Sequence, residues 1–422
     1  MRLLATDTDG PERLRAVARE AQQRPAHALP GYFYRSAVAY EADLSQIIYR
    51  SWLYAGHVSQ IPEPGDFFQY EIDEDAFIIS RAEDGSIHAL VNSCRHRGAR
   101  VCEEASGSRK TFVCPYHGWV YGLDGSLRGA RHMEREASFC AGSSGLRSIR
   151  LVTRHGLIFI NADPDAADFS MALDRIEPAL APYRLESAKV AHREVYPVGA
   201  NWKLALENYL ECYHCATSHR SYARSHSIKD ISSNIAPLRA ALWERAQRMT
   251  GVEGVTSTFD GCYDQEVAFG CSTWNNRYAL FDGYQTASRD GKPVAPLMGA
   301  FSGYDGGAGD FQIGPLAFML NYPDHCVLYR FTPRGLARSD MEVVWFVRGD
   351  AVEGRDYALD NLTWLWHTTT LEDEYIISRN SAGVNSRFYE PGHLQPDFEY
   401  IEIRFIKWYL DVLAGSALPA AD

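Results

Sequence analysis

The chain has 422 residues and a formal net charge of −12, with 46% hydrophobic and 23% charged residues. This length predicts two domains, or one large domain with an insertion, and the composition is that of a globular protein rather than a disordered or fibrous one. The acidic balance argues against a nucleic-acid groove, which needs clustered Lys and Arg to neutralise phosphate.

The first predicted helix covers residues 10–24 and is followed by Pro25 and Pro30. Ahead of it, Asp7 and Asp9 interrupt the apolar stretch that a secretory signal needs, and no later run is long enough to span a bilayer. We therefore expect a cytoplasmic protein without a membrane segment. The nine cysteines are an odd number at irregular spacing, so we expect reduced thiols rather than a disulfide framework.

From about Phe67 the hydrophobic pattern has a period of two, which predicts a small all-β unit. Glu83-Asp84-Gly85 and Leu123-Asp124-Gly125 read as turns between its strands. The predicted strands are Phe67–Ile72, Ala76–Arg81, Ile87–Asn92, Thr111–Cys114, Trp119–Tyr121 and Leu157–Ile160.

The pattern beyond Pro164 is mixed. Helices are predicted near 170–184, at 201–216 and over about 355–380, and β-rich sequence from about 266 to 348. Residues 283–314 are rich in Gly and polar groups and predict a mobile loop. This stretch lacks the Gly-x-Gly-x-x-Gly spacing of a dinucleotide site.

Two Cys/His pairs stand in predicted turns of the β unit: Cys94-Arg95-His96 and Cys114-Pro115-Tyr116-His117. Together they supply four metal ligands. A zinc site usually opens with two nearby cysteines, whereas each turn here gives one Cys and one His. The set fits a Rieske [2Fe–2S] cluster, in which two cysteines hold one iron and two histidines the other. A structural zinc site is the alternative.

A second candidate site lies in the segment 201–219. Glu211 and His214 are three residues apart and share a helix face, whereas His219 is five beyond His214, so the helix should end or distort between the two histidines. Two imidazoles and one carboxylate make the facial triad of an O₂-activating Fe(II) centre.

The carboxylate is predicted from the long helix at 355–380. Leu362, Trp366, Thr369, Asp373 and Ile376 form one stripe at spacings of three and four, and Asp373 is the acid on that line. A carboxylate on an apolar face is costly unless it is paired or binds a metal. We therefore favour Asp373 as third ligand, with Glu372 or another acid as alternatives.

The pair Cys212 and Cys215 is formally a Cys-x-x-Cys motif. A redox dithiol would be expected in a thioredoxin-like βαβ context, which the sequence around them lacks. We therefore interpret them as ordinary helix thiols.

These motifs resemble the Rieske non-haem iron oxygenase family, α subunit. The resemblance rests on the two Cys/His pairs, on Asn-Trp-Lys…Glu-Asn…Glu-x-Tyr-His-x₄-His from Asn201 to His219, and on the terminal segment from Glu372 to Gly392, all in the family's order. It implies an α+β protein with an all-β Rieske domain set into a helix-grip catalytic domain. The implied domains are a helical segment of the catalytic domain at 1–44, the Rieske domain at 45–162 and the catalytic domain at 163–422.

The resemblance also implies site roles and an assembly. Glu211 and Asn208 are implied as catalytic residues, with Glu211 accepting hydrogen bonds from His214 and from His117 of a neighbouring subunit. The family is usually a homotrimer in which each cluster reduces the iron of the next subunit.

Within the family, the segment Glu207–Glu211 is similar to the branch that contains glycine betaine and stachydrine demethylases, with carnitine and choline monooxygenases nearby. Relatives commonly carry Gln-Arg-Gly where this chain has Ser381-Ala382-Gly383, which argues against close substrate equivalence.

The leading hypothesis is O₂-dependent hydroxylation and N-demethylation of a small quaternary or tertiary amine. Five aromatic residues are candidates for a cage around the cation: Trp274, Tyr278, Phe281, Tyr284 and Phe318. The alternative is hydroxylation of an aromatic ring or aromatic acid, whose carboxylate Arg330 would clamp.

Two rivals from other classes are a pure Rieske electron carrier and a zinc-stabilised binding module. The former predicts full function without His214, and the latter predicts a colourless protein. The sequence has no flavin or nicotinamide motif, so the oxygenase reading implies a separate NAD(P)H-dependent flavin and iron–sulfur reductase, or a ferredoxin.

Overall fold

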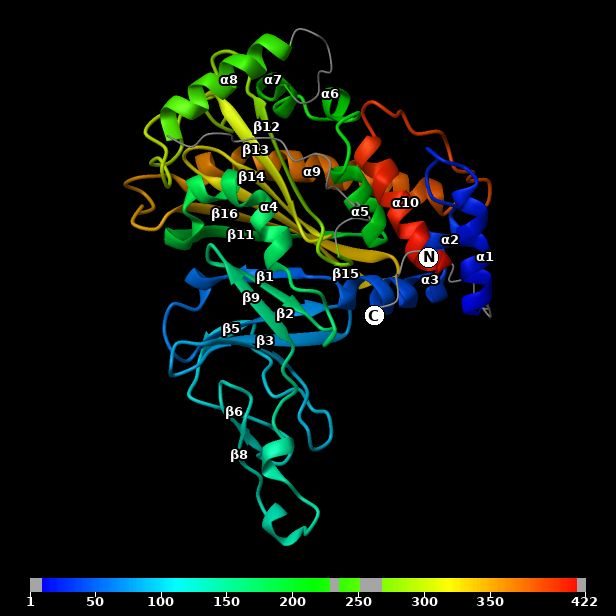
Figure 1. Cartoon of the computed structure of the whole chain (residues 1–422), viewed down its shortest axis with the longest axis vertical. Helices are drawn as coiled ribbons and strands as arrows, with labels where there is room; N and C mark the ends of the chain where they lie inside the picture. The colour runs from blue at the N-terminus through cyan, green and yellow to red at the C-terminus, as the bar shows by residue number, and fades with distance from the viewer. Residues whose placement is uncertain (1–9, 228–234, 251–267, 416–422) are drawn as a thin grey trace. The chain divides into compact units, whose positions relative to one another are not determined.

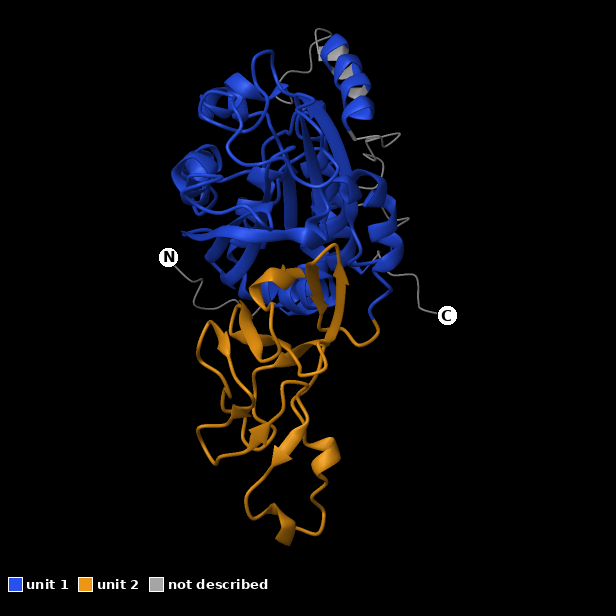
Figure 2. Cartoon of the chain, turned by 90° about the vertical axis from the view of Figure 1, so that its left-hand side faces the viewer, with its two compact units in different colours: residues 1–53, 166–422 blue, residues 54–165 orange. Residues whose placement is uncertain are grey.

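The computed structural model describes residues 10–227, 235–250 and 268–415. The chain forms two compact units, one made of residues 1–53 with 166–422 and the other of residues 54–165 (Figure 2). The smaller unit is thus an insertion in the larger one. The boundaries predicted from the sequence, 44/45 and 162/163, compare with 53/54 and 165/166 here, because the turns at Asp43–Arg50 group with the larger unit.

The smaller unit is built of short strands in three sheets, ordered β1-β10-β9, β4-β3-β2-β5 and β6-β7-β8. The predicted strands are confirmed as β2, β3, β4, β6, β7 and β10. Strands β1, β5, β8 and β9 were not predicted from the sequence, and of these β5 and β8 have only three residues. The strands are β1 Leu53–His57, β2 Asp66–Ile72, β3 Asp75–Arg81, β4 Ile87–Val91, β5 Ser106–Ser108, β6 Phe112–Val113, β7 Val120–Tyr121, β8 Leu127–Gly129, β9 Arg150–Arg154 and β10 Leu157–Asn161.

The larger unit is centred on a six-stranded sheet ordered β11-β16-β15-β14-β13-β12, with every neighbouring pair antiparallel. The β-rich region predicted at 266–348 is confirmed. The strands are β11 Ala188–Val198, β12 Thr273–Ala279, β13 Gly307–Ile313, β14 Ala317–Asn321, β15 Cys326–Gly335 and β16 Arg338–Arg348. With the helices described next, this sheet confirms the expected α+β class.

The prediction of a loop through 283–314 is wrong at its end, because β13 occupies Gly307–Ile313. A Cβ at Gly307 would collide with Leu242 and press on the guanidinium of Arg277. Glycine there reflects the close approach of these two side chains to the strand rather than mobility.

The predicted helices at 10–24, 170–184 and 355–380 are confirmed as α1, α4 and α9. Helix α9 contacts α5, β11 and β16, and α5 contacts β15 and β16, so both helices pack on the six-stranded sheet (Figure 1). The helices are α1 Pro11–Gln22, α2 Tyr32–Arg35, α3 Ala37–Ala42, α4 Ser170–Leu180, α5 Trp202–Tyr209, α6 Cys215–Ser218, α7 Tyr222–Ser225, α8 Ile235–Thr250, α9 Leu359–Val384 and α10 Tyr400–Ala414.

The two ends of the described chain pack together in the larger unit. Helix α1 contacts α10, Gln22 Nε2 donates to Asp411 Oδ1 at 2.7 Å, and the N–H of Ala28 donates to the carbonyl of Gly392 at 3.0 Å. The N-terminal segment is therefore completed by residues from the far end of the chain.

A fully buried ion pair anchors α5. The Asp43 carboxylate accepts hydrogen bonds from Lys203 Nζ, from Trp202 Nε1 at 3.0 Å and from Tyr409 Oη at 2.7 Å. Asp43 and Lys203 are both without exposed surface. A buried charge is tolerated only when paired and hydrogen-bonded, so this cluster fixes where α5 begins relative to α10.

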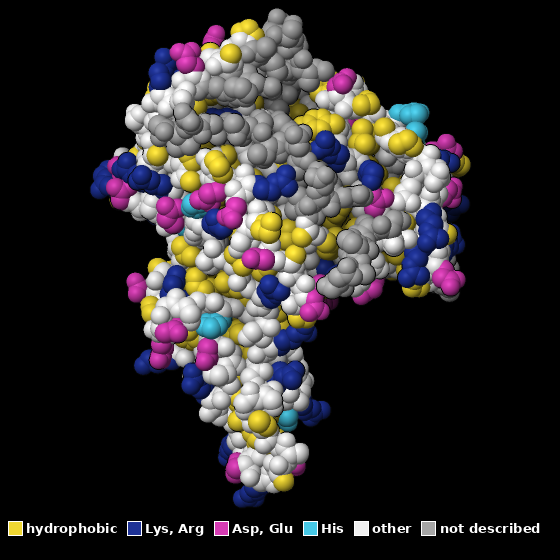
Figure 3. Space-filling view, in the orientation of Figure 1, with side chains coloured by type: hydrophobic (Ala, Val, Ile, Leu, Met, Phe, Trp, Pro, Cys, Tyr) yellow, Lys and Arg dark blue, Asp and Glu magenta, His cyan; other side chains and the backbone are white. Residues whose placement is uncertain are grey.

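On the face drawn in Figure 3, basic and acidic side chains of the described residues are interspersed rather than gathered into a basic stripe. Within the described ranges, none of the helices is both long and apolar enough to cross a bilayer.

Candidate metal centres

Two loops of the smaller unit share one backbone turn. The N–H of Gly98 donates to the carbonyl of Cys94 at 2.8 Å, and the N–H of Gly118 to that of Cys114 at 3.0 Å. Both glycines have positive φ, 80° and 72°, a conformation that other residues adopt only with strain. Equivalent turns therefore present Cys94 and Cys114, which explains why a glycine follows each cysteine by four residues.

The four predicted cluster residues are brought together by these turns. Cys94 and Cys114 are buried free thiols, whereas His96 and His117 are exposed. The Nδ1 atoms of the two histidines lie 3.1 Å apart, and Trp119 stacks on His96 with ring centroids 5.0 Å apart. The thiols thus face the interior and the imidazoles face the surface.

This donor set fits a [2Fe–2S] cluster. Soft thiolates on one side and converging imidazole nitrogens on the other are the ligands that a Rieske centre takes. The Tyr121 hydroxyl lies 3.2 Å from Cys94 Sγ and accepts the N–H of Arg95 at 3.1 Å. Hydrogen bonds of this kind to a ligand sulfur tune a cluster's reduction potential.

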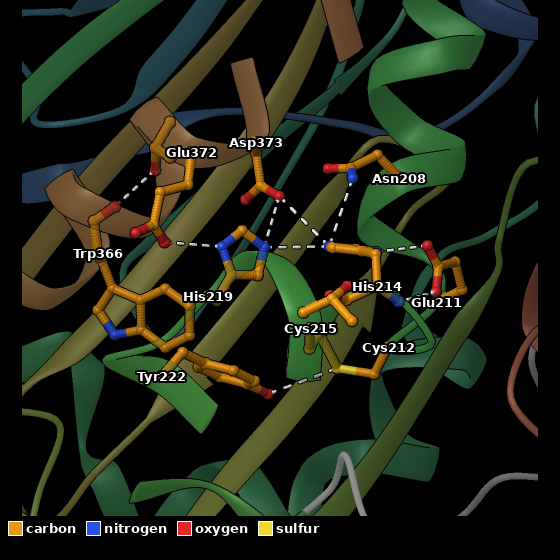
Figure 4. Close-up of polar contacts among 12 residues, drawn as sticks. Asn208, Glu211, Cys212, His214, Cys215, His219, Tyr222, Trp366, Glu372 and Asp373 are labelled. Carbon is orange, nitrogen blue, oxygen red and sulfur yellow. Dashed lines mark hydrogen bonds and ion pairs between the residues drawn. A yellow bond between two sulfur atoms is a disulfide. The ribbon is translucent and has the colours of Figure 1, made fainter. Parts of the chain in front are cut away.

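The second candidate site joins two histidines of one segment with a carboxylate from a distant helix. Nε2 of His214 and Nε2 of His219 are 3.1 Å apart, and Asp373 Oδ1 lies 3.4 Å and 2.9 Å from them (Figure 4). Among the described residues, these are the three that gather their donor atoms within 4.8 Å of one another. The structure thus brings together the residues that the sequence selects, and their role as ligands stays a prediction.

Each histidine is oriented from its other nitrogen by a carboxylate. His214 Nδ1 is hydrogen-bonded to Glu211, and His219 Nδ1 lies 2.9 Å from Glu372 Oε2 (Figure 4). With Nδ1–H donating to a carboxylate, each Nε2 keeps its lone pair toward Asp373. Glu372, the alternative third ligand, is therefore placed behind His219 rather than at the metal position.

The two Nε2 lone pairs and the Asp373 carboxylate oxygen face one another, and a cation bound between them would stabilise this arrangement. Asp373 Oδ1 is buried, and the partners that face it among the described residues are the two imidazole Nε2 atoms. Burial alone would lower the pKa of His214, but Asp373 and Glu211 outweigh it and raise the pKa to about 9. Two imidazoles and a carboxylate with open positions fit mononuclear Fe(II). Asn208 Nδ2 lies 3.4 Å from His214 Nε2, at the edge of this arrangement.

The helix predicted over 201–216 is interrupted earlier than expected. Helix α5 ends at Tyr209, and the one-turn α6 lies between the histidines, with His214 and His219 as its flanking residues. The break therefore precedes His214. The Glu211 carboxylate causes it by accepting the main-chain N–H groups of Tyr213 and His214, which competes with helix continuation.

Cys212 and Cys215 form a disulfide across this turn. The interpretation as ordinary helix thiols is therefore wrong, because the helix break brings the two sulfur atoms together.

A cavity of about 290 Å³ contains the His214, His219 and Asp373 side chains. Of the five predicted cage residues, Trp274, Tyr278 and Phe318 line it, whereas Phe281 and Tyr284 do not. Within the described residues, its lining has four carboxylates and no Lys or Arg. The carboxylates are Glu211, Asp310, Asp373 and Asp397.

The clamp predicted for the aromatic-acid alternative is absent from this cavity. Arg330 is buried in β15 and forms an ion pair with the buried Glu342 of β16. The prediction for Arg330 is wrong because Arg330 lies opposite Glu342 in the sheet, and its guanidinium is paired with that carboxylate.

Asp310 is the cavity residue that the sequence analysis missed. It lies in β13, within the stretch predicted as a loop, so its neighbours on β12 and β14 could not be inferred. The alternation of Asp310 and Gln312 with apolar Phe311 and Ile313 is the signal that would have indicated a strand.

Comparisons with known proteins match both parts of the chain to family models. A model of the Rieske [2Fe-2S] domain matches residues 51–148, and a model of the ring hydroxylating alpha subunit (catalytic domain) matches residues 185–415. The glycine betaine monooxygenase oxygenase subunit of Chromohalobacter salexigens is 32% identical over 98% of this chain and 93% of its own length. The carnitine monooxygenase oxygenase subunit of Escherichia coli is 32% identical over 49% of this chain and 55% of its own. The crystal structure of the quaternary ammonium Rieske monooxygenase CntA with L-carnitine matches with a TM-score of 0.68 at 20% identity, covering 96% of this chain and 99% of that one.

Proposed function

The chain belongs to the Rieske-type ring-hydroxylating oxygenase family, α subunit, and on that premise we propose that it demethylates a small quaternary or tertiary amine with O₂. It is an oxidoreductase that works with a separate reductase. The relatives named for glycine betaine and carnitine support an N-methylated substrate. The finer parts of the proposal are a flavin and iron–sulfur reductase or a ferredoxin, a homotrimer, and a cytoplasmic location.

In this proposal, Cys94, His96, Cys114 and His117 hold the [2Fe–2S] cluster. His214, His219 and Asp373 hold the iron. The cluster supplies electrons one at a time, and ferrous iron supplies a site at which O₂ is activated. The observation that carries the proposal is the convergence of two imidazole Nε2 atoms and a buried carboxylate oxygen in a cavity, in a chain that also carries the Cys/His turns.

The protein's own groups orient this chemistry. Glu211 and Glu372 fix the imidazole rings through their Nδ1 atoms, which keeps both Nε2 atoms aimed at one point. Glu211 is also the group that we propose connects His214 with His117 of a neighbouring copy, and Asn208 limits the space beside His214. Hydroxylation of an N-methyl carbon gives an unstable carbinolamine, which releases formaldehyde and the demethylated amine.

An amine is favoured over an aromatic acid by the charge of the cavity. Its described lining carries four carboxylates and no Lys or Arg, and Arg330 is committed to Glu342. Aromatic faces at Trp274 and Tyr278 attract a cation through their ring quadrupoles.

The test is turnover with a surrogate reductase, NADH and O₂ on a panel of N-methylated amines and aromatic acids. We expect formaldehyde in step with O₂ consumption for at least one amine. Ring-hydroxylated product, or uncoupled O₂ consumption with every amine, would contradict the proposal. Protein purified anaerobically with zinc and no acid-labile sulfide would contradict the cluster as well. The matched control is His214→Ala, which should keep the cluster absorbance and lose turnover.

A further inference from the structure

One acid stands in the middle of the sheet face that lines the cavity. Strand side chains alternate, so Trp274, Asn276 and Tyr278 of β12 share a face, and all three line the cavity. Asp310 of β13 is the register partner of Asn276 on one side and of Leu320 of β14 on the other, and both partners also line the cavity. Asp310 is therefore held by a rigid sheet rather than by a loop.

The other acids of the cavity have partners. Glu211 and Asp373 face the histidines, and Asp397 is exposed and accepts a hydrogen bond from Gln395 at 3.2 Å. Asp310 Oδ1 is buried, and no hydrogen-bond partner for it exists among the residues that the structure describes.

Among the described residues, the cavity wall that holds Asp310 offers no Lys or Arg as a counter-ion. Burial raises the pKa of the Tyr209, Tyr222 and Tyr278 hydroxyls, and the charge of Asp310 adds to this effect, so these phenols stay uncharged. Burial raises the pKa of Asp310 itself to about 7, and the main-chain N–H of Phe311 offsets this only in part. A carboxylate without a counter-ion in such a place lowers stability, and a bound cation would compensate it.

We propose that Asp310 binds the positive nitrogen of the substrate and selects a small organic cation that carries no carboxylate. The inference rests on the proposed amine demethylation and refines it. The carboxylate supplies the counter-charge, Trp274 and Tyr278 supply ring faces, and the described lining offers no basic group for a substrate carboxylate. The same cavity contains His214, His219 and Asp373, so a nitrogen held at Asp310 keeps its N-methyl groups in the space beside the proposed iron.

Binding without turnover tests the proposal, using the full-length protein loaded with iron and cluster under anaerobic conditions. The probes are choline, its neutral carbon isostere 3,3-dimethylbutan-1-ol, and glycine betaine, and affinity is measured by isothermal titration calorimetry. We expect the wild type to bind choline at least about tenfold more tightly than either of the other two probes.

The variant is Asp310→Asn, which removes the charge and keeps the shape. Choline affinity should fall about 10- to 100-fold, while affinity for the neutral alcohol should change less than about twofold. The matched control is Asp290→Asn, an exposed acid that pairs with Lys292 outside the cavity, and it should leave all three affinities unchanged. Equal choline affinity in wild type and Asp310→Asn, tighter binding of glycine betaine than of choline, or no choline binding at all would overturn the proposal.

A measurement on the wild type keeps the proposal testable if Asp310→Asn does not fold. Because the carboxylate of the free protein loses its proton near pH 7, choline should bind about tenfold more tightly at pH 8 than at pH 6. Among the described residues, the groups that face Asp310 are the phenols of Tyr209, Tyr222, Tyr278 and Tyr322, and burial raises their pKa values so that they stay neutral in this range. The neutral alcohol controls for other titrations. A pH-independent choline affinity would overturn the assignment.

The two proposals fail in different ways. If amine demethylation is wrong, no bound amine releases formaldehyde even where choline binds through Asp310. If the role of Asp310 is wrong, amines are demethylated with kinetics that Asp310→Asn leaves unchanged.

Discussion

Replacing Asp310 by Asn is expected to make the ligand-free protein more stable at pH 8. In the folded chain Asp310 Oδ1 is buried, and the described residues that line the cavity provide no Lys or Arg as a counter-ion, whereas in the unfolded chain the carboxylate is hydrated. An asparagine of the same shape has no charge to desolvate. A gain in stability together with a loss of cation binding would identify Asp310 as a residue kept for function at a cost in stability.

The magnitude follows from the pKa. Burial raises the pKa of Asp310 from 3.8 to about 7, which is roughly 3 pKa units, and each unit corresponds to about 1.4 kcal/mol, so the penalty at pH 8 is at most about 4 kcal/mol. The buried amide of asparagine still needs hydrogen bonds, and this requirement reduces the gain in unfolding free energy by about 1–2 kcal/mol. We therefore expect the variant to be more stable by about 2–3 kcal/mol, a rise of several degrees in the unfolding temperature.

The stability difference between Asp310→Asn and wild type should also change with pH. Because the folded pKa is raised, the unfolded chain loses its proton first, and wild-type stability from this group falls as pH rises from about 4 to about 7. The variant does not titrate there, so its advantage should be at least about twofold larger at pH 8 than at pH 5.

The assay is calorimetric unfolding of both proteins, without amines, at equal scan rate and ionic strength. Asp290→Asn serves as the control, because Asp290 is exposed and its pKa is lowered by Lys292, so that variant should gain nothing. An Asp310→Asn protein that is less stable than wild type at pH 8, or an advantage that does not depend on pH, would refute the reasoning. Either result would mean that the fold itself compensates the carboxylate.

Four further changes test the rest of the molecule. His214→Ala should lower bound iron from about three to about two atoms per chain with the cluster absorbance intact, and loss of all iron would contradict two separate centres. Cys114→Ser should abolish the cluster absorbance and acid-labile sulfide, so a retained visible spectrum would exclude it as a ligand. Glu211→Gln should retain both metals but slow O₂-driven reoxidation of the reduced cluster at least about tenfold in stopped-flow traces, and an unchanged rate would remove Glu211 from the electron path. Lys203→Met leaves Asp43 unpaired in the interior and should cost about 3–5 kcal/mol in chemical denaturation, whereas a loss below about 1 kcal/mol would show that neutral donors suffice.

Local patterns made much of the fold and the candidate site predictable. The Cys94 and Cys114 turns are encoded within six residues each, because a ligand pair and a glycine with positive φ occur together. Asp373 was selected because a helix of 26 residues keeps its period, so one acid on an apolar stripe stands out. His214 and His219 were selected by residue type and spacing.

Long-range pairing explains what the sequence could not predict. The contact of Glu372 with His219 depends on the ring orientation across two helices, and the disulfide at Cys212 depends on where α5 ends. Asp310 was missed because Gly307 and Gly309 indicate a loop until the strands on either side are known.

The meeting of α1 with α10 has a consequence for how the protein is made. A ribosome releases the whole of residues 54–165 long before it reaches α10, so the small unit has every residue that it needs to collapse and accept its cluster during synthesis. Helix α1 must instead wait for α10, more than 350 positions downstream, as the Gln22–Asp411 hydrogen bond illustrates. Folding therefore begins with the inserted unit, and the larger unit is completed only after α10 has been synthesised.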